Sequence, residues 1–111
     1  MSDSKDKTKN DIQEFQQLQQ QLQMILMQKQ NVQAQKSEIE NALNEINKIK
    51  DNDLYEVVGN IMIKKSKEES KKSLEKKKEM FDLRLKTIES QQKKMSEKAT
   101  ELQEKISKEI K

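Results

Sequence analysis

The stretch that decides the fold is Leu54 to Lys65, with the sequence LYEVVGNIMIKK. It holds the only glycine of the chain, Gly59, and β-branched residues lie on both sides of the dipeptide Gly59-Asn60. Glycine accepts a positive φ without a Cβ clash, so this dipeptide suits a two-residue turn between antiparallel strands. The stretch is therefore predicted to be a β-hairpin. Its predicted cross-strand pairs are Val58–Ile61, Val57–Met62, Glu56–Ile63 and Tyr55–Lys64.

A hairpin of this kind is marginally stable in water and leaves an unpaired strand edge on each side. The rest of the sequence shows no strand pattern, so the hairpins of other subunits are expected to cover these edges and to close a sheet or barrel. The residues assigned to this assembly are Tyr55, Val57, Val58, Gly59, Asn60, Ile61, Met62 and Ile63.

The composition on either side of the hairpin excludes an ordinary globule. Of the 111 residues, 31% are hydrophobic, 3% aromatic and 39% charged, which is too little apolar material to fill a spherical core. Disorder and coiled coil remain. The absence of proline and an apolar repeat in steps of three and four residues favour the coiled coil. The predicted fold class is mainly α: a long antiparallel two-helix coiled coil with the hairpin at its turn, and hairpins assembling into an oligomeric β-barrel.

The predicted segments are a flexible tail over 1–10, a first helix over 11–50, the hairpin over 54–65 and a second helix over 66–110, together one domain. Asp11 is the expected N-cap of the first helix, and Ser66 with Glu69 has the spacing of a capping box. The first seam comprises Phe15, Leu18, Leu22, Ile25, Lys29, Val32, Lys36, Ile39, Leu43, Ile46 and Lys50. The second comprises Leu74, Lys78, Phe81, Leu85, Ile88, Gln92, Met95, Ala99, Leu102, Ile106 and Glu109.

Two registers of the antiparallel pair satisfy these seams. One pairs residues whose numbers sum to 117, such as Leu22 with Met95, and the other pairs numbers that sum to 124, such as Leu22 with Leu102. Each gives five wholly apolar layers, so the sequence leaves the register open. Lys29 and Lys36 fall in the seam under both, where their stems can extend toward solvent at a cost in local stability.

Several functional classes are disfavoured by what the sequence lacks. It contains no cysteine and no histidine, so disulfides, thiolate ligands and the commonest general base are absent. No nucleophile or nucleotide-binding motif is found, so the protein is not expected to be an enzyme or to use a cofactor or a metal. The longest apolar run is Met24–Met27, and the first ten residues lack the apolar core of a signal peptide. A cytoplasmic protein without a membrane segment is expected.

The net charge is +3 and is unevenly distributed. Residues 11–53 carry four lysines against seven acids, and residues 64–111 carry sixteen basic against ten acidic residues. Pairing of an acidic first helix with a basic second helix accounts for this asymmetry. A nucleic-acid-binding arm is the alternative, but no aromatic side chains are interleaved with the lysines to stack on bases, so no nucleic-acid partner is expected.

Three stretches together resemble a known family. They are the glutamine-rich Leu18–Gln23 (LQQQLQ), the hairpin Tyr55–Lys65 (YEVVGNIMIKK) and Leu83–Glu89 (LRLKTIE). The chain resembles prefoldins, in particular the archaeal beta class with its single hairpin. The resemblance implies a hetero-hexamer of alpha-type and beta subunits, joined through their hairpins. It also implies an ATP-independent holdase that captures non-native proteins at its coiled-coil tips and transfers them to a group II chaperonin.

Carried onto this chain, the tips are residues 11–27 with 99–110. Terminal helical turns fray and gain least from their neighbours, so apolar seam residues there can open toward a client protein. Met24 and Met27 lie beside the seam, as adaptable apolar contacts or as incidental exposure. The candidate client-binding residues are Ile12, Phe15, Leu18, Leu22, Met24, Met27, Leu102, Ile106 and Ile110. The alternative is a structural coiled-coil scaffold, or an oligomerisation protein, that binds no client.

Overall fold

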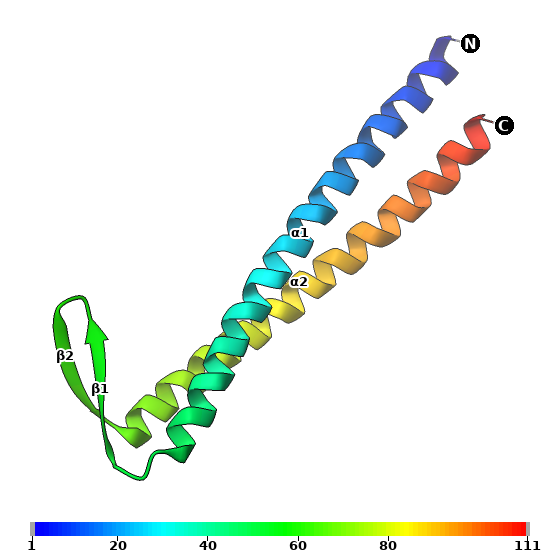
Figure 1. Ribbon diagram of the computed structural model, residues 1–111. Coiled ribbons are helices and arrows are strands. Elements are labelled where there is room, and N and C mark those ends of the chain that lie inside the picture. Colours follow the sequence, from blue (N-terminus) through cyan, green and yellow to red (C-terminus); the bar gives the residue numbers. More distant parts are fainter. Residues whose placement is uncertain (1, 111) are drawn as a thin grey trace. The chain divides into compact units, whose positions relative to one another are not determined.

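Two helices and a hairpin make up the part of the chain that the structure describes. The computed structural model describes the backbone of residues 2–110 and the side chains of residues 5–110. Its elements are α1 (Ser2–Lys48), β1 (Asp53–Val58), β2 (Ile61–Ser66) and α2 (Lys67–Ile110) (Figure 1). This confirms the predicted helices and hairpin. Closure of hairpins into a barrel involves other chains and stays a prediction.

The chain divides into two compact units. One, here called the helical unit, consists of Met1–Gln30 and Lys86–Lys111, and the other, here called the hairpin unit, is Asn31–Leu85. Met1, in the predicted tail, and Lys111, at the end of the predicted domain, lie outside the described residues.

Helix α1 differs from its predicted bounds at both ends. It begins at Ser2, so the start predicted at Asp11 is wrong. The first ten residues contain neither glycine nor proline, and nothing in them stops the helix from extending toward the N-terminus. Asp11 is therefore a buried residue inside the helix, where its carboxylate lies 3.3 Å from the ammonium of Lys105. The flexibility predicted for residues 1–10 stays a prediction.

At its other end α1 stops at Lys48, two residues before the predicted boundary. The N–H of Ile49 donates to the carbonyl of Ile46 at 3.1 Å, which closes a last tight turn. Lys67 provides hydrogen-bond donors to two carbonyl groups beyond this turn. Its ammonium donates to the Ile49 carbonyl at 2.7 Å, and its N–H donates to the Asn52 carbonyl at 2.6 Å. These hydrogen bonds connect the first residue of α2 to the segment that follows α1.

The predicted seams are confirmed by burial. Every seam residue is buried or half-buried except Lys50, which lies beyond the end of α1. In the helical unit Leu18, Ala99 and Leu102 form a buried core, against which Phe15, Leu22 and Met95 pack. These residues are the partners of the register that sums to 117, so the structure selects that register.

The hairpin has the predicted cross-strand pairs, and its strands extend one residue further at each end, to the pair Asp53–Ser66. Gly59 has a φ of 61°, whereas Asn60 has no positive φ. A positive φ at the first turn position only is the pattern of a type II′ turn. At the base of the hairpin, the Ser66 hydroxyl accepts the N–H of Glu69 at 3.1 Å, which confirms the predicted N-cap of α2.

Candidate functional site

The hairpin presents a large apolar surface. Strand residues alternate between the two faces of a sheet, so neighbouring apolar residues on each strand place side chains on both faces. All six large apolar side chains assigned to assembly are exposed, with fractions between 43% and 67%: Tyr55, Val57, Val58, Ile61, Met62 and Ile63. Exposed apolar clusters of this kind mark protein interaction sites. Gly59 and Asn60, the other two assigned residues, form the turn.

Two ion pairs hold the strands in register. Lys65 lies 2.5 Å from Glu56 and Lys64 lies 3.4 Å from Asp53, each joining β2 to β1. The hydrogen bond from Lys65, reinforced by its charge, holds the pKa of Glu56 below its usual value. The charged residues of the hairpin are thus paired with one another, whereas its six large apolar side chains assigned to assembly remain exposed.

In the helical unit the nine candidate client-binding residues fall into three groups. Leu18 and Leu102 are buried in the core. Ile12, Phe15, Leu22 and Ile106 are half-buried along the seam. Met24, Met27 and Ile110 are exposed, the two methionines at 62% and 64%. The last group is the most exposed of the three and presents apolar surface without any opening of the helix pair.

Two hollows lie between α1 and α2 of the helical unit. One, of about 400 Å³, is lined by Gln21, Met24, Ile25, Gln28, Gln91, Lys94 and Met95, and is here called the methionine groove. The other, of about 550 Å³, is lined by Lys5, Thr8, Lys9, Ile12, Gln13, Glu109 and Ile110. Each brings candidate residues of α1 together with residues of α2.

Comparison with known proteins decides the family. The model of the family described as "Prefoldin subunit" matches residues 9–111. The chain belongs to the prefoldin subunit family. The predicted resemblance is confirmed, and the protein is a prefoldin-type chaperone subunit.

Individual relatives agree with this assignment. The chain is 40% identical over 98 residues to "Prefoldin subunit beta" of Archaeoglobus fulgidus, covering 87% of this chain and 84% of that protein. It is 40% identical over 89 residues to the protein of the same name from Pyrococcus furiosus, covering 79% and 76% of the two chains. The crystal structure of the prefoldin beta subunit from Thermococcus strain KS-1 matches with a TM-score of 0.87 and 34% identity, over 92% of this chain and 90% of that one.

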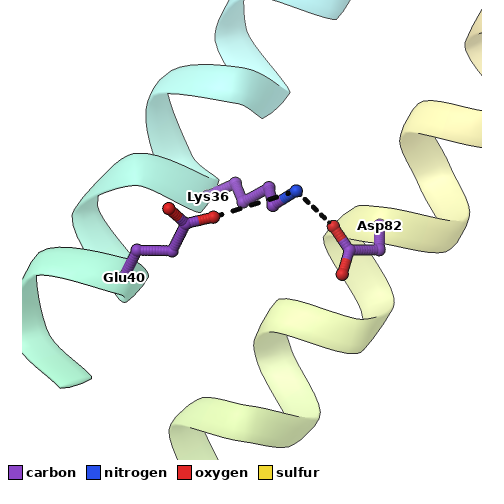
Figure 2. A network of polar contacts seen from close by, with 3 residues as sticks. All are labelled: Lys36, Glu40 and Asp82. Atoms are coloured by element: carbon purple, nitrogen blue, oxygen red, sulfur yellow. Dashed lines mark ion pairs between the residues drawn. The ribbon is translucent and has the colours of Figure 1, made fainter. Parts of the chain in front are cut away.

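The seam lysines of this prefoldin subunit carry ion pairs. In the helical unit Lys29 lies 3.9 Å from Glu89. In the hairpin unit Lys36 lies 2.6 Å from Asp82 of α2 and 3.8 Å from Glu40 of α1 (Figure 2). The hydrogen bond to Asp82 is the main reason why the pKa of Lys36 is raised. Both lysines thus reach an acidic partner on the facing helix, in agreement with the predicted extension of their stems.

Sequence reasoning missed part of this surface. The α2 side of the methionine groove, formed by Gln91, Lys94 and Met95, was not among the candidate residues, and neither was Leu26, which is 45% exposed. The register sum of 117 places Met95 opposite Leu22 and would have brought these α2 residues beside Met24.

Among the described residues, no cluster of three or more carboxylate, histidine or cysteine side chains is arranged to hold a metal ion. Neither α1 nor α2, over its described length, contains an apolar segment long enough to cross a membrane.

Proposed function

We propose that this chain is the beta-type subunit of an ATP-independent holdase. It assembles through its hairpin with alpha-type prefoldin subunits and further beta subunits into a hetero-hexamer. Its helical unit captures non-native proteins and transfers them to a group II chaperonin. The protein acts in the cytoplasm, without catalysis or a cofactor.

The observation that carries this proposal is the presence of two kinds of exposed apolar surface on different units. On the hairpin unit, six apolar side chains flank two open strand edges. Backbone groups at such an edge pair with another strand, so this surface favours permanent, ordered assembly. The names of the relatives, each a subunit of prefoldin, support the same role.

The surface on the helical unit is of a different kind. Met24 and Met27 stand exposed on a helix surface that is otherwise rich in uncharged glutamine. Unbranched, polarisable methionine side chains adapt to apolar partners of many shapes. Contacts of this kind are individually weak, and several helical units in one assembly would combine them through avidity. Half-buried seam residues such as Phe15 and Leu22 add to this surface when the terminal turns fray.

The test is suppression of aggregation of a chemically denatured model protein, measured by light scattering with the chain alone and with an alpha-type prefoldin subunit. We expect suppression at a few-fold molar excess and a stronger effect from the mixed complex. The double substitution Met24→Glu and Met27→Glu should weaken capture and leave the mass of the complex unchanged. Its matched control is Gln20→Glu with Gln23→Glu, which adds the same charges at the same spacing on exposed positions.

Absence of suppression by an assembled complex would contradict the proposal and favour the scaffold alternative. Equal loss of capture in the methionine and glutamine variants would show that added charge, and not loss of apolar contact, is responsible. In that case the capture surface lies elsewhere in the chain.

A further inference from the structure

The methionine groove combines a soft apolar floor with a polar rim. Ile25 is buried at its base, Met95 is half-buried, and Met24 is exposed at its edge. Its volume of about 400 Å³ falls within the range of protein sites that hold a small ligand, and so suffices for an apolar side chain with its adjoining backbone. The two thioethers give the floor a shape that adjusts to different apolar side chains.

Three primary amides surround this floor. Gln21 and Gln28 from α1 and Gln91 from α2 are exposed and line the groove. Each glutamine side chain both donates and accepts hydrogen bonds. An extended segment of a non-native protein carries unpaired N–H and C=O groups, which such a rim satisfies without regard to sequence.

The groove also has a charge preference. Lys94 is the one charged residue that lines it. Its neighbour one turn along, Lys98, is paired with Glu14 at 3.5 Å, whereas Lys94 makes no ion pair with any described residue. The ammonium of Lys94 is therefore available at the edge of an apolar floor, and its charge complements a carboxylate on the occupant.

We infer that the methionine groove binds extended segments of non-native proteins in which an apolar side chain is flanked by acidic residues. This inference rests on the proposed holdase function and defines the class of client segment that the helical unit prefers. The apolar side chain lies on Met24, Ile25 and Met95, and the client carboxylate pairs with Lys94.

Peptide binding to the full chain assembled with an alpha-type subunit tests the inference. Three unstructured, fluorescently labelled peptides share one Leu-Phe pair, flanked on both sides by two glutamates, two glutamines or two lysines. Fluorescence anisotropy gives the dissociation constant of each. Because an exposed ion pair contributes about 0.2–1 kcal/mol, we expect the glutamate peptide to bind about 1.4- to fivefold more tightly than the glutamine peptide, and the lysine peptide more weakly. Near 1 M salt, where the screening length is about 3 Å, the three should bind alike.

The variant Lys94→Glu should abolish or reverse this preference, and Lys93→Glu is the matched control. Lys93 is exposed, carries the same charge and is adjacent in sequence, but it does not line the groove. The control should retain the preference. An equal response of the two variants would overturn the inference, because it would reflect the general field of α2 instead of a contact in the groove.

Other outcomes separate this inference from the proposed function. If aggregation of a denatured protein is still suppressed but no peptide preference depends on Lys94, the inference fails and the holdase function stands. If Lys94→Glu changes the mass of the assembled complex, a second subunit occupies the groove and the inference is wrong. If neither peptides nor denatured proteins are bound, both fail together.

Discussion

Replacement of Gly59 by the two mirror-image alanines tests the turn that joins the strands. Gly59 has a φ of 61°, in the left-handed region, and a Cβ built there meets no atom of the described chain within 4 Å. The cost of L-alanine is therefore one of backbone strain and not of space. An L-residue held in such a sparsely populated backbone conformation costs about 1–3 kcal/mol. The smaller backbone freedom of alanine in the unfolded chain offsets about 0.4–1 kcal/mol of this cost.

The two enantiomers should consequently act in opposite directions. Gly59→Ala should destabilise the hairpin by up to about 2.6 kcal/mol, with a central value of about 1.3 kcal/mol, the difference between those two effects. A D-alanine at position 59, introduced by chemical ligation, adopts this φ without strain and should stabilise the hairpin by about 0.4–1 kcal/mol. Because about 1.4 kcal/mol corresponds to a tenfold change in an equilibrium constant, the concentration at which the complex assembles should shift by several-fold, upward for L-alanine and downward for D-alanine.

Sedimentation velocity over a dilution series of the mixed complex measures this shift, and circular dichroism checks that the helices remain folded. No effect of L-alanine would refute the argument that the turn limits assembly. Equal weakening by both enantiomers would mean that a neighbouring subunit packs against the Gly59 α-carbon, where a methyl group of either hand is excluded.

Three further predictions concern stability. Ser66→Ala removes the hydroxyl that accepts the Glu69 N–H, and should lower the stability measured by denaturant unfolding by about 0.5–2 kcal/mol, whereas Ser70→Ala, within the same helix, should have a smaller effect. Leu18→Ala opens the core of the helical unit and should cost about 2–5 kcal/mol, compared with less than about 0.5 kcal/mol for the exposed Leu26→Ala; equal losses would contradict the burial of Leu18 in this core. The pKa of Glu56 is lowered by Lys65, so the stability gained from this pair is complete above the ordinary carboxyl pKa of 4.5 and is lost as the pH falls below it through the lowered value. Glu56→Gln should flatten this acid-side loss in thermal melts, and an unchanged pH profile would show that the pair does not stabilise the fold.

The seams and the hairpin could be predicted from the sequence because both rest on local periodicity. The steps of three and four residues identified the residues that are least exposed, and the glycine-containing turn fixed every cross-strand pair by counting outward from it. The start of α1 could not be found in this way. Asp11 has the side chain of a helix cap, but its carboxylate is instead paired with Lys105, which is distant in sequence and visible only in the folded chain.

The register illustrates the same limit. Sums of 117 and 124 both produced apolar layers, and contacts of the folded chain, such as the packing of Leu18 with Ala99 and Leu102, distinguish them. The methionine groove depends on that choice, since the register determines which α2 residues lie beside Met24. The sequence could indicate that methionines lie on a glutamine-rich helix surface, but it could not show that Lys94 of α2 lies beside Met24.

The central claim is that assembly belongs to the hairpin and client capture to the helical unit. Its most direct test is deletion of residues 1–28 together with 91–111, which removes Met24, Met27 and every residue that lines the methionine groove. Native mass measurement of the complex with an alpha-type subunit and light scattering with a denatured model protein then follow. We predict a complex with the same number of subunits that no longer suppresses aggregation. Undiminished suppression by the truncated complex, or its failure to assemble, would contradict this division of roles.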